Sequence, residues 1–378
     1  MYDIAQGAAF RIPLTREAFS LRTVALVAGD QHQGWYTSDA TVTLQVYGPS
    51  GAVASTEYQL NAGAGWVPYL GPITLSDSGT HVVKYRSKDA AGNAEPEQAV
   101  TVRIDKQSPV SQLQASGTPG DGGWYRSPAT VTLQVYDTHS GVERTEYAIT
   151  VTASAYGQQS HGFIPYTGPF TLDEGIYGIQ FRSVDTAGKE EAVQTAELKV
   201  DRTAPSVVVY ANGVTATPVI QVEDSETTVL TLQASEALSG VAARSITVNG
   251  AVYGEGTPIS WAGRPGDHAV RVTVSDHAGN VTDQTFTIRV TTSPSSILAL
   301  LSGFVQANAL GRPTEAKLSN SMSQANHHFG SGRMSQALHF LDKFLDTIQE
   351  EGGTISASAR LVLESDARKL QSIWSANL

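Results

Sequence analysis

Asp137 and Asp185 are the residues whose type and placement best suit a metal ion. Asp137 ends a predicted strand just before Ser140, and Asp185 opens a predicted hairpin. Calcium prefers oxygen ligands and takes about six to eight of them. Two carboxylates supply few of these, so the alternative that both are solvated turn caps is favoured. Calcium is the one cofactor considered, and no other is expected.

Three aromatic residues are candidates for stacking on a sugar ring. Trp66, Tyr156 and Trp261 lie in Gly- or Ala-rich connections and have no counterpart at matching positions of the repeats described below. An exposed ring in such a loop offers a flat apolar face for carbohydrate. The alternative, which is the more common arrangement for large aromatic side chains, is that each ring packs against its own domain.

Motifs for catalysis are not found in the chain. We find no Ser, His and acid set, no His-Glu-x-x-His zinc helix and no phosphate loop. The absence of Cys removes disulfides, thiolate zinc sites and Cys nucleophiles together. Paired carboxylates for glycoside cleavage are not excluded by spacing alone. We therefore expect that the chain is not an enzyme, and no catalytic residue is assigned.

Charge and hydropathy exclude two classes of partner. The chain has 25 Lys and Arg against 36 Asp and Glu, a formal net charge of −11, with no basic stripe for phosphates. Nucleic acid is therefore not an expected partner, and no apolar run is long enough for a membrane span. The N-terminus lacks a signal peptide. We expect Met1 to be a start inside a longer secreted polypeptide, the alternative being a cytoplasmic protein.

The elements around these candidates come in repeated copies. The segments Ala40–Tyr47 and Ala129–Tyr136 have identical sequences, and each follows a Gly-Trp-Tyr entry. In the first, Val42, Leu44 and Val46 alternate with polar residues, which is the period of a strand with one buried face. A weaker third copy includes Leu230, Leu232 and Ala234. Internal duplication over whole domains predicts tandem modules of one fold.

Two further positions recur in all three copies. His81, Tyr177 and His268 each follow a Gly by two residues and precede an Asp by eight. An immunoglobulin-like (Ig-like) sandwich has its tyrosine corner at this position. That Asp is followed three residues later by a Gly, as a tight hairpin needs. The copies resemble the bacterial Ig-like modules appended to secreted polysaccharide-degrading enzymes and surface proteins, and this fold implies that Asp137 and Asp185 lie at the same end of the second module.

A change of period after Val290 predicts four amphipathic helices. Apolar residues there recur at three- and four-residue spacing, and Gly- or Pro-containing breaks separate the helices, with Ser356 as a candidate N-cap. The tail resembles the FIMAH domain over about residues 296 to 376. The resemblance implies an extracellular setting and contact with glycans. It is carried by Ala316-Lys317-Leu318, Gln324-Ala325, Ala337-Leu338, Phe340-Leu341, Phe344-Leu345 and Ile355-Ser356.

The predicted fold is mainly β, with three tandem Ig-like β-sandwiches followed by a C-terminal four-helix domain. The expected domains are residues 31–105, 106–201 and 202–292 for the Ig-like modules and 293–378 for the FIMAH-like domain. Residues 1–30 are taken as an upstream segment or the end of a preceding module, with a strand from Phe19 to Val27.

These resemblances imply a non-catalytic accessory region of a secreted bacterial carbohydrate-active enzyme. Its modules are expected to act as spacers and to contact polysaccharide, and its other expected partner is an upstream catalytic domain in a longer chain. The alternative is a cell-surface adhesin or stalk that binds a protein or cell-wall partner. Both functions imply an extracellular location. A standalone enzyme of unfamiliar type is a third and weaker reading.

Overall fold

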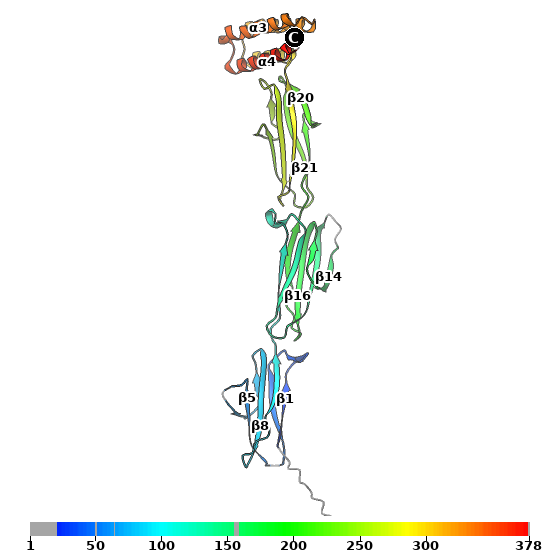
Figure 1. Cartoon of the computed structure of the whole chain (residues 1–378), viewed down its shortest axis with the longest axis vertical. Coiled ribbons are helices and arrows are strands. Elements are labelled where there is room, and N and C mark those ends of the chain that lie inside the picture. Colours follow the sequence, from blue (N-terminus) through cyan, green and yellow to red (C-terminus); the bar gives the residue numbers. More distant parts are fainter. Residues whose placement is uncertain (1–20, 50, 64, 155–158, 377–378) are drawn as a thin grey trace, which may run out of the picture. The chain divides into compact units, whose positions relative to one another are not determined.

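The computed structural model describes residues 21–376, apart from residues 50, 64 and 155–158 (Figure 1). Along the chain, three β-sandwich modules are followed by four helices, so the mainly β fold and the predicted order of elements are confirmed. The chain forms two compact units. Of the described residues, one unit holds those from 21 to 116 with those from 129 to 198, and the other holds those from 117 to 128 with those from 199 to 376. Each candidate site lies within one of these units.

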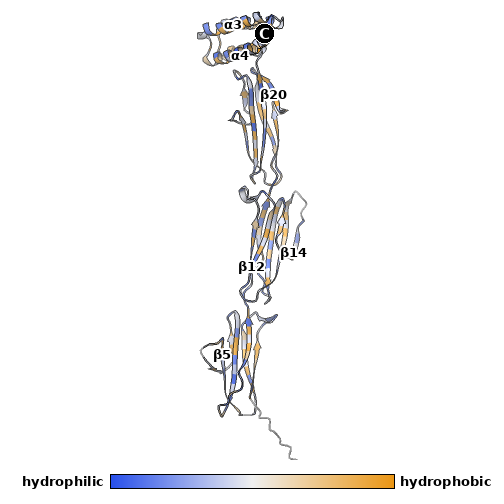
Figure 2. Ribbon diagram, viewed as in Figure 1, coloured by the Kyte–Doolittle hydropathy of each residue, from blue (hydrophilic) through white to orange (hydrophobic). Residues whose placement is uncertain are grey.

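Alternating side chains explain why the repeated segments form strands. In β4 (Ala40–Tyr47), Ala40, Val42 and Leu44 are buried, and the residues between them are more exposed. Successive side chains of a strand point to opposite faces, so such a segment buries one face and exposes the other. Figure 2 shows apolar and polar residues mixed in this way along the strands.

The first module is a sandwich of two sheets with strand orders β1-β4-β7 and β2-β3-β9-β8-β5-β6. Its core takes Val42 and Ile73 from one sheet and Val83 and Val102 from the other. The strands are β1 (Arg22–Ala28), β2 (Gln31–His32), β3 (Trp35–Tyr36), β4 (Ala40–Tyr47), β5 (Val53–Leu60), β6 (Val67–Pro68), β7 (Ile73–Leu75), β8 (Gly79–Asp89) and β9 (Gln98–Ile104).

The first strand corrects one prediction. Strand β1 pairs antiparallel with β4 along its whole length, from Arg22 opposite Tyr47 to Ala28 opposite Thr41. It is therefore the first strand of the first module and not the last strand of a preceding one, because only this pairing completes the three-stranded sheet. The module begins at Arg22 rather than at residue 31. The rest of that prediction, residues 1–20, lies outside the described part of the chain.

The second and third modules repeat this arrangement. Their sheets have the orders β10-β12-β15 and β11-β17-β16-β13-β14, then β19-β18-β21-β24 and β20-β26-β25-β22-β23. The strands of the second module are β10 (Val110–Ser116), β11 (Trp124–Tyr125), β12 (Ala129–Tyr136), β13 (Val142–Ser154), β14 (His161–Pro165), β15 (Phe170–Leu172), β16 (Gly175–Asp185) and β17 (Gln194–Val200). Those of the third are β18 (Ser206–Ala211), β19 (Val214–Thr215), β20 (Val219–Glu223), β21 (Thr227–Ser235), β22 (Val241–Val248), β23 (Ala251–Tyr253), β24 (Pro258–Ser260), β25 (Gly266–Asp276) and β26 (Val281–Thr291).

The predicted corner is present in all three modules. His81 Nε2, Tyr177 Oη and His268 Nε2 each donate to the backbone carbonyl four residues earlier, at 2.8, 2.9 and 2.7 Å. This hydrogen bond joins the start of the long strand to the turn before it, which is the tyrosine corner of an Ig-like sandwich. Histidine and tyrosine both serve here because the side-chain donor of each reaches the same backbone carbonyl. The corner confirms the Ig-like assignment independently of sequence likeness.

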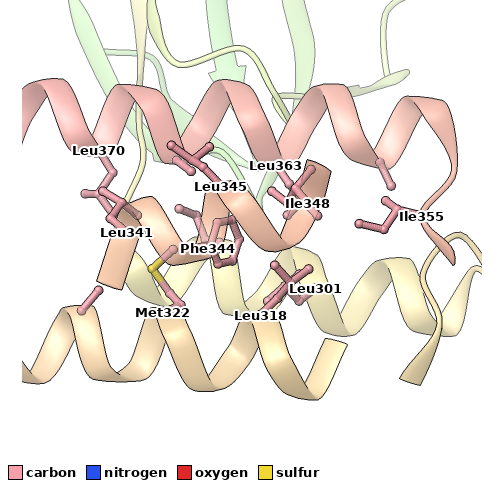
Figure 3. Close-up of a cluster of buried hydrophobic side chains, with 14 of the residues drawn as sticks. Leu301, Leu318, Met322, Leu341, Phe344, Leu345, Ile348, Ile355, Leu363 and Leu370 are labelled. Atoms are coloured by element: carbon pink, nitrogen blue, oxygen red, sulfur yellow. The ribbon is translucent and has the colours of Figure 1, made fainter. Parts of the chain in front are cut away.

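The helical domain has four helices around one core. They are α1 (Pro294–Gln306), α2 (Arg312–Gly330), α3 (Met334–Glu350) and α4 (Ala357–Ser375). The predicted N-cap is confirmed, since Ser356 Oγ accepts a hydrogen bond from the N–H of Ala359 at 3.2 Å. The core draws side chains from every helix, among them Leu301, Met322, Phe344 and Leu363 (Figure 3).

Candidate metal centre

Three aspartates come together at one end of the second module. Asp105 directly follows β9, the last strand of the first module, Asp137 follows β12, and Asp185 ends β16. One carboxylate oxygen from each lies within 4.8 Å of the others. The sequence predicted Asp137 and Asp185 as a pair, and the structure adds Asp105. We call these three residues the Asp105 cluster.

Backbone N–H groups orient the two predicted residues. Asp137 Oδ1 accepts hydrogen bonds from the N–H groups of His139 at 3.1 Å and Gly141 at 2.6 Å. Asp185 Oδ1 accepts from the N–H of Lys189 at 2.8 Å. Each side chain thus caps its own turn through one oxygen, as the turn-cap alternative predicts. The second oxygen of each is left over.

Asp105 connects the end of the first module to the same loop. Its Oδ1 accepts from the N–H of Gln107 and its Oδ2 from the N–H of Ser140, both at 3.0 Å. Each carboxylate oxygen has further lone pairs, so these bonds leave it able to bind a cation. Through Asp105, an ion in this cluster would hold the segment after β9 to the second module.

Two oxygens of the Asp105 cluster are buried without any hydrogen-bond partner. They are Asp137 Oδ2 and Asp185 Oδ2. The side chains of Asp105 and Asp185 are both 0% exposed. A buried charged oxygen left unpaired costs at least about 1–3 kcal/mol. The geometry therefore calls for a positive partner between these carboxylates.

The electrostatics of the cluster point the same way. Burial raises the pKa of Asp185 above its usual value, and the charges of Asp105 and Asp137 raise it further, while the N–H of Lys189 lowers it. Both the loss of water and the neighbouring negative charges disfavour the ionised form. A cation among the three would offset both penalties through its attraction to the ionised carboxylates.

Comparison among the modules shows why the second one differs. In the first, the Asn93 amide donates to Asp89 Oδ2 at 3.0 Å, and in the third the Asn280 amide donates to Asp276 Oδ2 at 2.9 Å. The second module has Lys189 at this position. The oxygen that Asn satisfies in its neighbours is the one that is unpartnered on Asp185.

The third module contains a matching set of acids whose oxygens are already bonded. Glu236 stands where the second module has Asp137, and both of its oxygens accept from the N–H of Leu238. The Asn280 amide donates to Asp276 Oδ2 and also to the carbonyl of Asp201. The first module has Gly48 in place of Asp137. The second module is therefore the best suited of the three to bind an ion.

The Asp105 cluster fits calcium. It offers three carboxylates, which are hard oxygen donors, and calcium completes such a set with backbone carbonyls and water. It offers no imidazole or thiolate, the ligands that zinc and copper favour. Because two of the carboxylates are fully buried, an ion here would be shielded from substrates and would act on structure.

Trp261 is not the exposed aromatic platform that the sequence suggested. Its side chain is 0% exposed, its indole N–H donates to Thr228 Oγ1 at 2.8 Å, and its ring centroid lies 4.9 Å from that of His268. The residue fills the space beside the corner histidine in the core of the third module. The prediction that it binds carbohydrate is therefore wrong, and the alternative of an aromatic packed into its own domain is correct.

Trp66 has a counterpart after all. It stands two residues before Pro68, and Phe163 stands two residues before Pro165. The guanidinium of Arg86 lies 4.0 Å from the centre of the Trp66 ring, and that of Arg182 lies 4.6 Å from the centre of the Phe163 ring. One face of Trp66 is thus covered by a repeated cation–π pair, and the side chain is half-buried.

Tyr156, the third aromatic candidate, lies outside the described residues.

None of the helices in the described part of the chain is long and apolar enough to cross a membrane.

The chain is a modular, mainly β protein, in which tandem Ig-like sandwiches are followed by a four-helix domain. The helical part is a FIMAH domain: residues 294–372 match the model of that family, as the sequence pattern predicted. No curated protein matches the chain.

Among solved structures, the chain is similar to the fibronectin(III)-like modules of Clostridium thermocellum CbhA, with 16% identity over 48% of this chain and 94% of that one and a TM-score of 0.24. A bacterial ice-binding adhesin involved in host cell surface retention has 16% identity over 71% and 98%, with a TM-score of 0.26. A tetra-tandem repeat of a large adhesion protein has 15% identity over 71% and 74%, also with a TM-score of 0.26. The fold assignment rests on the strand order and the corner rather than on these scores.

Proposed function

We propose that this chain is a non-catalytic extracellular spacer whose second Ig-like module binds calcium through Asp105, Asp137 and Asp185. The observation that carries the proposal is the pair of buried, unpartnered oxygens on Asp137 and Asp185. Asp105 comes from the end of the first module and the other two from the second. Calcium would therefore stiffen the short connection at residues 105–109, which suits a chain that holds other domains apart.

An extracellular setting supports this assignment. Calcium sites of extracellular modules bind with dissociation constants of about 10⁻⁴–10⁻³ M, weak enough to be empty inside a cell and filled outside it. The match of residues 294–372 to the FIMAH family supports that location, because the resemblance described above implies an extracellular setting.

The parent of the spacer is the finer part of the proposal. The FIMAH resemblance favours an accessory region of a secreted bacterial carbohydrate-active enzyme, with polysaccharide and an upstream catalytic domain as partners. A cell-surface stalk or adhesin is the second candidate, because a calcium-stiffened connection between modules serves a stalk equally well. With Trp261 buried, Trp66 is the one described aromatic of the predicted set that still supports polysaccharide contact.

Limited digestion with trypsin tests the calcium-stiffened connection. Trypsin cleaves after Lys106 and Arg202, which lie at equivalent places after the first and second modules. We expect calcium to slow cleavage after Lys106 relative to digestion in EDTA, since an ion on Asp105 restrains the adjoining backbone. Cleavage after Arg202 is the internal control and should not change, because the acids beside it are already bonded.

Equal slowing of both cuts would mean that calcium acts on trypsin rather than on the chain. An unchanged rate after Lys106 would contradict the proposal.

A further inference from the structure

A second set of buried oxygens lies where the helical domain meets the third module, inside one compact unit. Asp224 follows β20, Thr292 follows β26, and Asp366 lies on α4. Their side chains are 1%, 7% and 0% exposed. We call these three residues the junction set. No predicted site included any of them.

Hydrogen bonds hold the two domains together around this set. The hydroxyl of Ser293, the N-cap of α1, donates to Glu223 Oε1 at 2.9 Å. The hydroxyl of Ser365 on α4 donates to the carbonyl of Gly263 at 3.3 Å. Glu223 and Ser365 are the sequence neighbours of Asp224 and Asp366, so these two hydrogen bonds lie beside the junction set. The junction set itself is buried away from water.

Five oxygens of the junction set have no hydrogen-bond partner. They are both oxygens of Asp224, both oxygens of Asp366 and Oγ1 of Thr292. The hydroxyls of Thr292 and Ser296 lie close enough to lower the pKa of Asp224, yet neither reaches hydrogen-bonding geometry with its oxygens. Ser296 donates its hydroxyl proton to the carbonyl of Ser293 at 3.0 Å instead.

The charges around the pair are negative. Burial, and then the charge of Asp224, raise the pKa of Asp366 to about 7, while the N–H of Gly263 opposes the shift. Burial is also the largest cause that raises the pKa of Asp224, and Glu223 adds to it. Each charged group that the structure records acting on the pair is therefore a carboxylate. This electrostatic environment attracts a cation.

We propose that Asp224, Thr292 and Asp366 bind a calcium ion that fastens the FIMAH domain to the third Ig-like module. Oxygen-only donors that include two carboxylates and a hydroxyl match calcium, which takes about six to eight oxygen ligands. A proton shared by the two carboxyls is the competing arrangement. One proton joins only two of the four carboxylate oxygens and leaves the other two unpartnered, whereas a cation can accept electron pairs from several oxygens at once.

The site goes beyond the spacer function proposed above, because it concerns a different junction and different residues. Its consequence is that calcium fixes the chain at two places, after the first module and before the helices. Since α4 and β20 are far apart in the sequence, the ion closes the interface in the way a crosslink would. Removal of calcium is expected to loosen the FIMAH domain while each core stays folded.

Isothermal calorimetry with calcium tests the proposal on the full-length chain, stripped with EDTA and held at about pH 8 so that Asp366 is ionised. Four proteins are compared: the wild type, Asp137→Ala, Asp366→Asn and the double variant. We expect two equivalents of calcium for the wild type, one for each single variant and none for the double variant. Asp224→Asn, made on the opposite side of the interface, should match Asp366→Asn.

The design separates this site from the Asp105 cluster. If Asp366→Asn and Asp224→Asn both bind as many equivalents as the wild type, the junction site is refuted, and a shared proton is the better account. If those variants lose one equivalent but Asp137→Ala does not, the junction site stands and the Asp105 cluster fails. Circular dichroism of each variant in EDTA checks folding. Both Asn variants should melt no lower than the wild type there, since each removes a buried charge.

Discussion

Replacing Trp261 with Ala is expected to lower the free energy of unfolding of the third module by about 3–5 kcal/mol, the cost typical of deleting a fully buried large aromatic side chain. The ring is 0% exposed, and its loss also leaves Thr228 Oγ1 without the indole N–H that it accepts. Scanning calorimetry measures the effect, because a domain of this size shifts its melting temperature by about 4–8 °C for each kcal/mol.

Trp66→Ala is the matched control for this substitution. Trp66 is half-buried and covered by Arg86 on one face, so its removal should destabilise the first module by a clearly smaller amount. Equal shifts for the two variants would contradict the assignment of Trp261 to the core. If folded Trp261→Ala lost polysaccharide binding, Trp261 would be a carbohydrate-binding residue after all, against what its burial indicates.

Replacing Asp185 with Asn is expected to abolish calcium binding at the Asp105 cluster and, in EDTA, to stabilise the second module by about 1–3 kcal/mol. The amide keeps an oxygen for the N–H of Lys189 and can donate its own hydrogen to Asp137 Oδ2, which is unpartnered. It also removes a buried charge whose pKa the neighbouring acids raise. Melting curves with EDTA and with calcium measure both effects.

Asp276→Asn, at the equivalent place in the third module, should have the opposite outcome. There the Asn280 amide already donates to Asp276 Oδ2 at 2.9 Å. An NH₂ group in place of this oxygen could not accept that hydrogen bond, and two donors would face each other. We expect a lower melting temperature and no change in calcium binding. If the two substitutions act alike, the unpartnered oxygen of Asp185 is not what distinguishes the second module.

The sequence predicted the fold through short-range patterns. Alternation in Ala40–Tyr47, the ring at Tyr177 and the N-cap at Ser356 are local features, and each appears in the structure as expected. The sequence predicts residues 1–30 as an upstream segment or the end of a preceding module, because nothing within strand β1 shows that it pairs with β4. Local physics therefore identified the elements but not all of their partners.

The candidate sites were predicted only in part, because they are assembled from distant segments. Asp137 and Asp185 stood out within one module, but Asp105 belongs to the end of the previous one and joins them through the tertiary fold. Asp224 and Asp366 lie in different domains and carry no motif. One feature of the sequence does indicate the Asp105 cluster. Lys189 stands where both other modules have Asn, and this difference distinguishes Asp185, four residues earlier, from its counterparts.

Two aromatic residues differ from the sequence-based expectation for a related reason. Trp66 and Phe163 look unrelated because the connections before them differ, and only the shared Arg contact reveals that they are equivalent. Trp261 lies beside Gly and Ala in sequence, as an exposed loop residue would, yet its neighbour in space is the buried corner His268. Composition around a residue does not determine the direction of its side chain.

A crystal structure of the chain grown in calcium, with anomalous scattering from the ion, would show whether Asp105, Asp137 and Asp185 bind calcium. We expect an anomalous peak in the Asp105 cluster, about 2.3–2.6 Å from Asp137 Oδ2 and Asp185 Oδ2. We expect no such peak beside Glu236 in the third module, whose oxygens are already bonded. A well-ordered Asp105 cluster with the Lys189 ammonium or a water between the two carboxylates, and no peak, would refute calcium binding by the second module.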